Sequence, residues 1–236
     1  MSLFAVPAVQ VAQIFAEPAV RDRLRVVPRK TGWPRADDVV LGEDVAVELG
    51  NPKDGSLFFL HWDSGDDLPA DRLQLLGPDI HEIEPRGLAF ALALRVAGSF
   101  ADEYETFCAL KNAVYDTRLQ GLSIRMLPSR QSIWCRLEQQ ARNHGFSLAH
   151  LGAALGESLH AVAGVRSVEV TMVVGDKPLV KRLSRPAADI ARIGGALLKM
   201  NEEMDLDCEH CEYWDVCEAV AELKRIRARL QTERHA

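Results

Sequence analysis

Apolar and polar residues alternate in several short stretches of the chain, and each stretch predicts a β-strand. Val168, Val170 and Met172 lie two residues apart, so they would share one face of a strand. Residues 88–96 are almost continuously apolar, as expected of a central strand that is buried on both faces. The predicted strands are residues 45–49, 56–62, 72–76, 88–96, 122–126, 132–137 and 167–174. Turn-forming residues at positions 51–55 predict a hairpin between the first two strands.

Other stretches have the helical period, with apolar residues three or four positions apart. Asp102 and Ser147 are residue types that cap helices, so helices are expected to follow each of them. Gly152 and Gly156 lie in the second of these helices, where small residues predict tight packing of the helix on a sheet. A third helix is expected to open at Ser184 and Pro186. A fourth helix is expected over residues 216–230.

Proline residues interrupt the first part of the chain. Pro18, Pro28 and Pro34 predict an irregular lead-in over residues 1–44, in which one short helix could place Val9 and Phe15 on the same face. The strands and helices of residues 45–204 predict one α+β domain with a mixed sheet. Residues 205–236 would add a cysteine motif and a C-terminal helix.

Composition narrows the class of protein. Of the 236 residues, 47% are hydrophobic and 26% are charged, as in ordinary globular proteins. The net charge of −6 argues against nucleic acid as the main partner. No apolar run is long enough to span a membrane, and the first residues lack the basic start of a signal peptide. We therefore expect a cytoplasmic protein whose cysteines stay reduced.

Three of the five cysteines lie within ten residues near the end of the chain. Cys208, Cys211 and Cys217 have the spacing C-x2-C-x5-C. Thiolates are the ligands that soft metals and iron–sulfur clusters prefer, and a C-x2-C pair aims two sulfur atoms at one centre. A domain of this length needs no covalent staples for its stability. The motif therefore predicts a metal-binding site.

A [4Fe–4S] cluster fits this spacing better than zinc, which is kept as the alternative. Structural zinc sites commonly use two pairs of ligands, and no second C-x2-C or H-x3-H pair occurs in the chain. Three clustered cysteines with one remote ligand suit a cluster. Cys135 and Cys108 are the remaining thiols, and Cys135 is the candidate fourth ligand. Both are also typical of small buried residues, and an open fourth position is the other alternative.

Several segments, in their shared order, resemble the acetyl-CoA synthase subunit of the carbon monoxide dehydrogenase complex. They are Val47-Glu48-Leu49-Gly50, Leu76-Gly77-Pro78-Asp79-Ile80, Ser132-Ile133-Trp134-Cys135-Arg136, Gly145-Phe146, the strand up to Val174 and the cysteine motif. The resemblance covers roughly residues 40–217 and implies a related α+β fold. It also implies that Cys208 and Cys211 match the C-x2-C of the family's cluster-binding region, whereas Cys217 comes sooner than the family's third cysteine. The family's later cluster cysteine and its Cys-Gly-Cys nickel site have no counterpart among the 236 residues.

Two classes of function follow from these observations. The first is an accessory iron–sulfur protein that transfers electrons or helps to assemble a complex, with a protein partner or a second copy of the chain. The second is an enzyme that uses an open-site cluster on a small carbon or thioester substrate. An iron–sulfur nuclease is disfavoured, because the one Glu-x-Lys of the chain, Glu222-Leu223-Lys224, falls inside a predicted helix.

Overall fold

The computed structural model describes residues 3–35, 40, 42–63, 68, 70–127 and 131–199. These residues form an α+β fold with two mixed sheets, which confirms the predicted class. The predicted cysteine motif and the C-terminal helix lie outside the described residues. Among the described helices, none combines the length and the hydrophobicity that crossing a membrane requires.

The larger sheet has five strands in the order β1-β4-β9-β6-β3. Its strands are β1 (Arg25–Val26), β4 (Arg72–Leu76), β9 (Val165–Val174), β6 (Phe90–Gly98) and β3 (Ser56–Asp63). β4 runs parallel to β9 and β3 runs parallel to β6, whereas β6 and β9 are antiparallel. The smaller sheet has the order β5-β2-β8-β7. It contains β5 (Gly87–Leu88), β2 (Val45–Leu49), β8 (Ser132–Glu138) and β7 (Leu122–Leu127).

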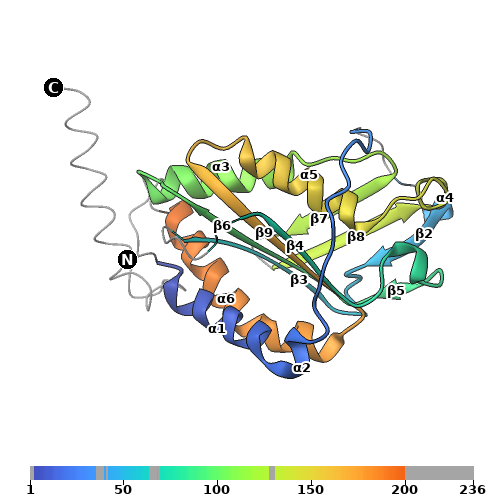
Figure 1. The fold of residues 1–236 in the computed structure, drawn as a ribbon, viewed down its shortest axis with the longest axis horizontal. Coiled ribbons are helices and arrows are strands. Elements are labelled where there is room, and N and C mark those ends of the chain that lie inside the picture. Colours follow the sequence, from blue (N-terminus) through green and yellow to red (C-terminus); the bar gives the residue numbers. More distant parts are fainter. Residues whose placement is uncertain are drawn as a thin grey trace.

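Helices cover both faces of the larger sheet (Figure 1). One side carries α3 (Glu103–Tyr115) and α5 (Leu148–His160), and the other carries α1 (Ala5–Ala16) and α6 (Lys177–Lys199). α5 packs on β9 and β4, while α6 packs on β3 and β6 and also contacts α1. The short helices are α2 (Pro18–Arg21), α4 (Gln139–Asn143), η1 (Gly42–Asp44) and η2 (Ile80–Glu82).

The face of the large sheet that meets α5 is apolar. Val168, Val170 and Met172 of β9 are all buried, as their alternation predicts. A Cβ placed on Gly152 of α5 would lie 2.4 Å from Cδ1 of the buried Leu73 in β4, so a larger residue here would force Leu73 or the helix to shift. Gly152 therefore serves the tight packing of helix on sheet that the pattern predicts, whereas Gly156 faces the guanidinium of Arg29 instead.

The predicted hairpin between residues 45–49 and 56–62 is wrong, because these strands belong to different sheets. β2 pairs with β5 and β8, and β3 pairs with β6. The turn at residues 51–55 does exist, since the amide groups of Asp54 and Gly55 both donate to the carbonyl of Asn51. That turn carries the chain from one sheet to the other. Local turn chemistry indicates a reversal of the chain, but the pairing of the strands depends on distant partners.

The helix predicted to open at Ser184 begins earlier, at Lys177 of α6. Its N-terminus is capped by Asp176, whose Oδ1 accepts a hydrogen bond from the amide of Leu179 at 2.9 Å. Pro186 lies inside α6 and costs the helix one backbone hydrogen bond. Leu183 and Ile190, on either side of this proline, are buried, so packing on the sheet offsets the cost.

The lead-in contains more regular structure than its prolines predict. α1 has twelve residues and lies beside α6, and β1 extends the edge of the large sheet by pairing with β4. The buried side of α1 holds Pro7 and Val11, whereas Val9, which the pattern placed on one face with Phe15, is 55% exposed. α1 covers only part of the sheet face on which it lies, and it leaves a hollow between itself and the strands.

Candidate functional site

The cysteines predicted to bind a metal fall into two groups. The first group, Cys208, Cys211 and Cys217, lies outside the described residues, so their role as metal ligands stays a prediction. Cys135 and Cys108 are both free thiols within the described part of the chain. In that part, no three His, Cys, Asp or Glu side chains come together in a group that could hold a metal ion.

Cys135 lies in the middle of the smaller sheet. Its backbone is opposite Leu49 of β2 on one side and Ile124 of β7 on the other. Its side chain is 1% exposed, and burial raises the pKa of the thiol to about 12. At neutral pH this thiol is therefore protonated unless a metal ion displaces the proton. Cys108 is half-buried on α3, with no disulfide partner.

A row of ionisable side chains crosses the other face of the large sheet, which α1 only partly covers. His61 of β3 lies opposite Arg95 of β6, and Arg95 lies opposite Glu169 of β9. Glu169 is in turn opposite Arg72 of β4, whose Nη1 is 3.7 Å from Oε2 of Glu169. Side chains that are directly opposite across neighbouring strands are close enough to interact. The register therefore places one carboxylate between two guanidinium groups.

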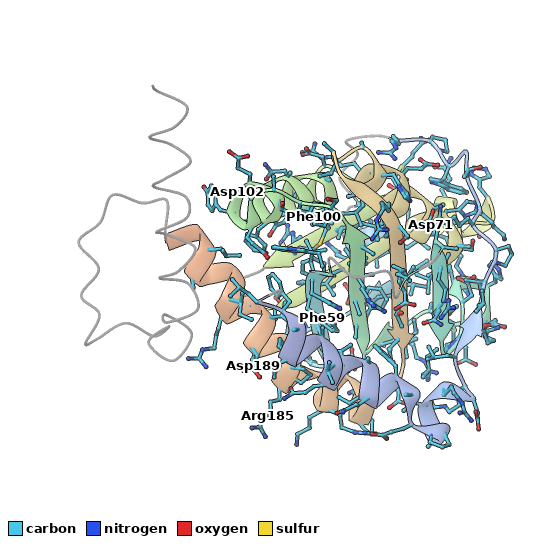
Figure 2. All side chains as sticks on the ribbon, turned by 60° about the vertical axis from the view of Figure 1, so that its left-hand side comes forward. Phe59, Asp71, Phe100, Asp102, Arg185 and Asp189 are labelled. Atoms are coloured by element: carbon cyan, nitrogen blue, oxygen red, sulfur yellow. The ribbon has the colours of Figure 1, made fainter. Side chains whose placement is uncertain are left out.

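A second row lies two residues along the same strands. Thr171 of β9 donates a hydrogen bond from Oγ1 to Oε1 of Gln74 in β4, at 3.2 Å. Its neighbour in β6 is Ala93, and Phe59 of β3 follows. The ring of Phe59 is stacked on His61 with centroids 6.1 Å apart, and Figure 2 labels Phe59 on this face of the sheet. The first row thus carries mainly charged groups, and the second carries an amide, a hydroxyl and an aromatic ring.

Apart from Phe59, these two rows form the floor of a pocket of about 430 Å³ beneath α1. The floor consists of His61, Arg72, Gln74, Ala93, Arg95, Glu169 and Thr171, joined by Trp62. The facing wall is apolar and comes from one helix, with Ala5, Ala8, Val9, Val11, Ala12 and Phe15. Pockets that bind small molecules commonly have about 300–1,000 Å³, mostly apolar walls and a few convergent polar groups. The space beneath α1 has a volume in this range and one apolar wall, while its floor is largely polar.

The polar groups of this floor differ in their contact with water. His61 and Thr171 are each 3% exposed, whereas the side chain of Glu169 is 19% exposed and that of Arg72 is 49% exposed. The deep end of the pocket is thus nearly dry, and Arg72 lies at its open side. Charge–charge interactions are stronger in such a partly desolvated place than on an open surface.

The sequence alone does not reveal this pocket, although it contains one hint: charged residues within two otherwise apolar strands. Arg95 is the one charged residue of the apolar run at residues 88–96, and Glu169 interrupts the apolar residues of 167–174. Each of them alone is typical of a solvated position on the second face of a strand. The register of four strands is needed to bring them together.

These observations define the class of protein: an α+β domain with two mixed sheets and a half-polar pocket on one face of the larger sheet. The chain belongs to the family described as "CO dehydrogenase/acetyl-CoA synthase complex beta subunit", whose model matches residues 29–179, more than half of its length. This confirms the resemblance drawn from the sequence. The match covers β2 to β9 and ends in α6, so α1 and the cysteine motif lie outside it.

Three curated relatives carry the name "Acetyl-CoA decarbonylase/synthase complex subunit beta". The protein of Methanopyrus kandleri is 31% identical over 57% of this chain and 29% of its own length. That of Methanothermobacter thermautotrophicus is 31% identical over 46% of this chain and 23% of its own length. The protein called "subunit beta 2" of Methanocaldococcus jannaschii is 24% identical over 79% of this chain and 40% of its own length. The chain thus spans less than half the length of these curated relatives.

Proposed function

We propose that this chain is an iron–sulfur protein in which Cys208, Cys211 and Cys217 hold a [4Fe–4S] cluster. The observation that carries the proposal is the order of the two parts. A domain of the beta-subunit family is followed, after α6, by three thiols within ten residues. Thiolates are the usual protein ligands of such clusters, so the donor set is chemically suitable. When bound, the cluster would supply one-electron transfer.

The role that fits best is an accessory one, in electron transfer or in the assembly of a complex. The relatives are named as subunits of an acetyl-CoA decarbonylase/synthase complex, which supports a protein partner for this chain. The sequence contains no Cys-Gly-Cys, the motif that the family resemblance associates with nickel. We therefore propose that the chain serves such a complex without carrying nickel chemistry on these 236 residues.

Metal analysis of anaerobically purified protein tests the cluster. We expect about four iron and four acid-labile sulfide atoms per chain, and an electron paramagnetic resonance signal after reduction. Cys211→Ser should remove most of the iron, whereas Cys108→Ser on α3 is the matched control and should retain it. A colourless protein with about one zinc ion per chain would favour the zinc alternative. A protein without any bound metal would refute the site.

The fourth ligand is tested by Cys135→Ala in the same assay. Cys135 is packed inside the smaller sheet, so the structure by itself accounts for it as a core residue. If its thiol is also the fourth ligand, Cys135→Ala should lose iron as Cys211→Ser does. If the iron content is unchanged, three cysteines of the motif hold the cluster.

A catalytic role is the second candidate. The burial of Cys135 favours it, because a thiol that is packed in the core would leave only the three cysteines of the motif to hold the cluster. A cluster held by three protein thiolates leaves one iron open for a small ligand. Binding of cyanide or a small thiol to the reduced protein, followed as a change in the paramagnetic resonance signal, distinguishes the two roles. An unchanged signal at saturating ligand would contradict the open site and leave the accessory role.

A further inference from the structure

We propose that the pocket beneath α1 binds a small neutral molecule that carries a carbonyl group and an apolar tail. This site is separate from the proposed cluster and does not depend on it. It is formed by described residues of α1 and of four strands in the larger sheet. Its support comes from a hydrogen-bonding pair in the floor, from the apolar wall, and from the way in which the charged groups of the floor are already engaged.

Gln74 of β4 and Thr171 of β9 are the hydrogen-bonding pair. They lie opposite each other in the strand register, and both line the pocket. The hydroxyl of Thr171 donates to Oε1 of Gln74 at 3.2 Å, so this contact uses the acceptor side of the amide. Within the described part of the chain it is the one hydrogen bond of the Gln74 side chain, and the two N–H groups of Nε2 stay available to a ligand. A carbonyl oxygen is the acceptor that suits such a donor.

Ala93 of β6 leaves room beside this pair. It is the neighbour of Thr171 across the sheet, and its side chain is a single methyl group. Both Ala93 and Thr171 are buried, so this part of the floor is nearly closed to bulk water. A hydrogen bond to a ligand is stronger in such a place than on an open surface. The volume of about 430 Å³ is sufficient for a small organic molecule.

The wall opposite the floor is apolar. α1 lines the pocket with alanine, valine and phenylalanine side chains only, and none of its twelve residues is charged. Polar groups that face an apolar surface lose contact with water without gaining new partners. A molecule with one polar end and an apolar body matches both surfaces, because its carbonyl group can reach Gln74 while its tail lies along α1.

The charged groups of the floor are already engaged, and this favours a neutral molecule over an ion. Arg72 and Glu169 form an ion pair, with Nη1 and Oε2 3.7 Å apart. Arg95 and His61 each have a partner as well. A bound ion would have to compete with these contacts, and it would also lose its own hydration, which is costly for a charged group. A neutral molecule leaves the contacts of the floor intact.

The test uses 4-phenylbutyramide as the probe and the full chain as the protein. Isothermal titration calorimetry should show saturable binding of about one molecule per chain, with a dissociation constant in the micromolar to millimolar range. At neutral pH, 4-phenylbutyrate and 4-phenylbutylamine share the carbon skeleton of the probe but carry a negative and a positive charge. Each of them should bind at least about tenfold more weakly than the amide.

Two pairs of variants locate the binding. Gln74→Met removes the amide at nearly constant side-chain length, whereas Gln13→Met makes the same change at an exposed position of α1 outside the pocket lining. Ala8→Leu fills the pocket from α1, whereas Ala16→Leu adds the same side chain at an exposed position outside the lining. We expect Gln74→Met and Ala8→Leu to weaken binding about fivefold or more, and the two controls to stay within about twofold.

Circular dichroism and melting temperature confirm that each variant is folded. The proposal is overturned if 4-phenylbutyramide shows no saturable binding at millimolar concentration, or if either ion binds as tightly as the amide. It is also overturned if Gln74→Met and Gln13→Met bind the amide equally well, or if Ala8→Leu and Ala16→Leu do. Without any binding of the amide, the hollow is only a water-filled gap between α1 and the sheet.

Discussion

The hydroxyl of Ser56 in β3 accepts a hydrogen bond of 2.7 Å from the amide of Ile133 in β8 and donates one to the carbonyl of the same residue. β2 pairs with β8 only as far as the Leu49–Cys135 register, so Ile133 lies just beyond its end. Gly50 follows β2 with a φ of +76°, and a Cβ there would lie 2.0 Å from the carbonyl oxygen of Ile133. Ser56 thus provides the hydrogen-bond partners that β2 no longer supplies at Ile133, and it joins the two sheets.

Removing this hydroxyl should destabilise the joint between the sheets. Ser56→Ala leaves both backbone groups of Ile133 without their partner, and the expected loss is about 1–3 kcal/mol in the free energy of unfolding. Chemical denaturation followed by circular dichroism measures it. Ser123→Ala on β7 is the control, since it also replaces a half-buried strand serine, and it should cost less than about 0.5 kcal/mol. Equal losses in both variants would contradict the role of Ser56.

The two glycines of α5 should respond in opposite ways to alanine. Gly152→Ala brings a methyl group within 2.4 Å of the buried Leu73 and should destabilise the protein by about 1–3 kcal/mol. Near Gly156 the closest atoms belong to the Arg29 guanidinium, 3.6 Å from the added carbon. Gly156→Ala should therefore stabilise the helix by about 0.5–1 kcal/mol. Melting temperatures of the two variants decide this, and the same sign of change in both would refute the packing argument.

Asp71 should make stability depend on acid pH. It lies at one end of β4 in Figure 2, where its carboxylate contacts Arg29 at 2.8 Å and His160 Nε2 at 2.9 Å and accepts the amide of Val168. Burial acts to raise the pKa of Asp71, but these partners together outweigh it and lower the pKa below its ordinary value. A carboxyl with a lowered pKa contributes stability above its unfolded pKa of about 3.9, and this contribution is lost as the pH falls through its folded pKa.

The corresponding variant is Asp71→Asn. It should lose about 1–3 kcal/mol at pH 7, and its difference from the parent protein should shrink as the pH falls below about 4. Urea denaturation at neutral, mildly acidic and strongly acidic pH gives this difference directly. Asp22→Asn is the control, because its ion pair with Arg21 is largely exposed and should contribute little at any pH. A difference that grew toward acid pH would contradict the expected sign.

Cys135 should be unreactive in the folded protein. Its thiol is buried and its pKa is about 12, so almost no thiolate is available to an alkylating reagent in mildly alkaline buffer. Iodoacetamide treatment followed by peptide mass spectrometry should leave Cys135 unmodified until denaturant is added. The half-buried Cys108 should be modified sooner. Rapid modification of Cys135 under native conditions would show that the smaller sheet opens readily.

Much of the secondary structure was predictable from local patterns. The alternation of Val168, Val170 and Met172 correctly indicated β9, and Asp102 caps α3 as expected, with Oδ1 accepting from the amide of Glu105 at 2.7 Å. The start of α6 was misplaced because Pro186 is a stronger local signal than Asp176. Such signals report which conformations a segment favours, and tertiary packing decides among them.

The two candidate sites differ in how far the sequence alone could predict them. By itself, the sequence predicted a thiolate metal site at Cys208, Cys211 and Cys217, because three thiols within ten residues are a pattern typical of metal ligands. Only the tertiary structure decided that Arg72, Arg95 and Glu169 form one row beneath α1. These three residues come from strands far apart in the chain. Strand order and register, which depend on contacts across the whole domain, place them together.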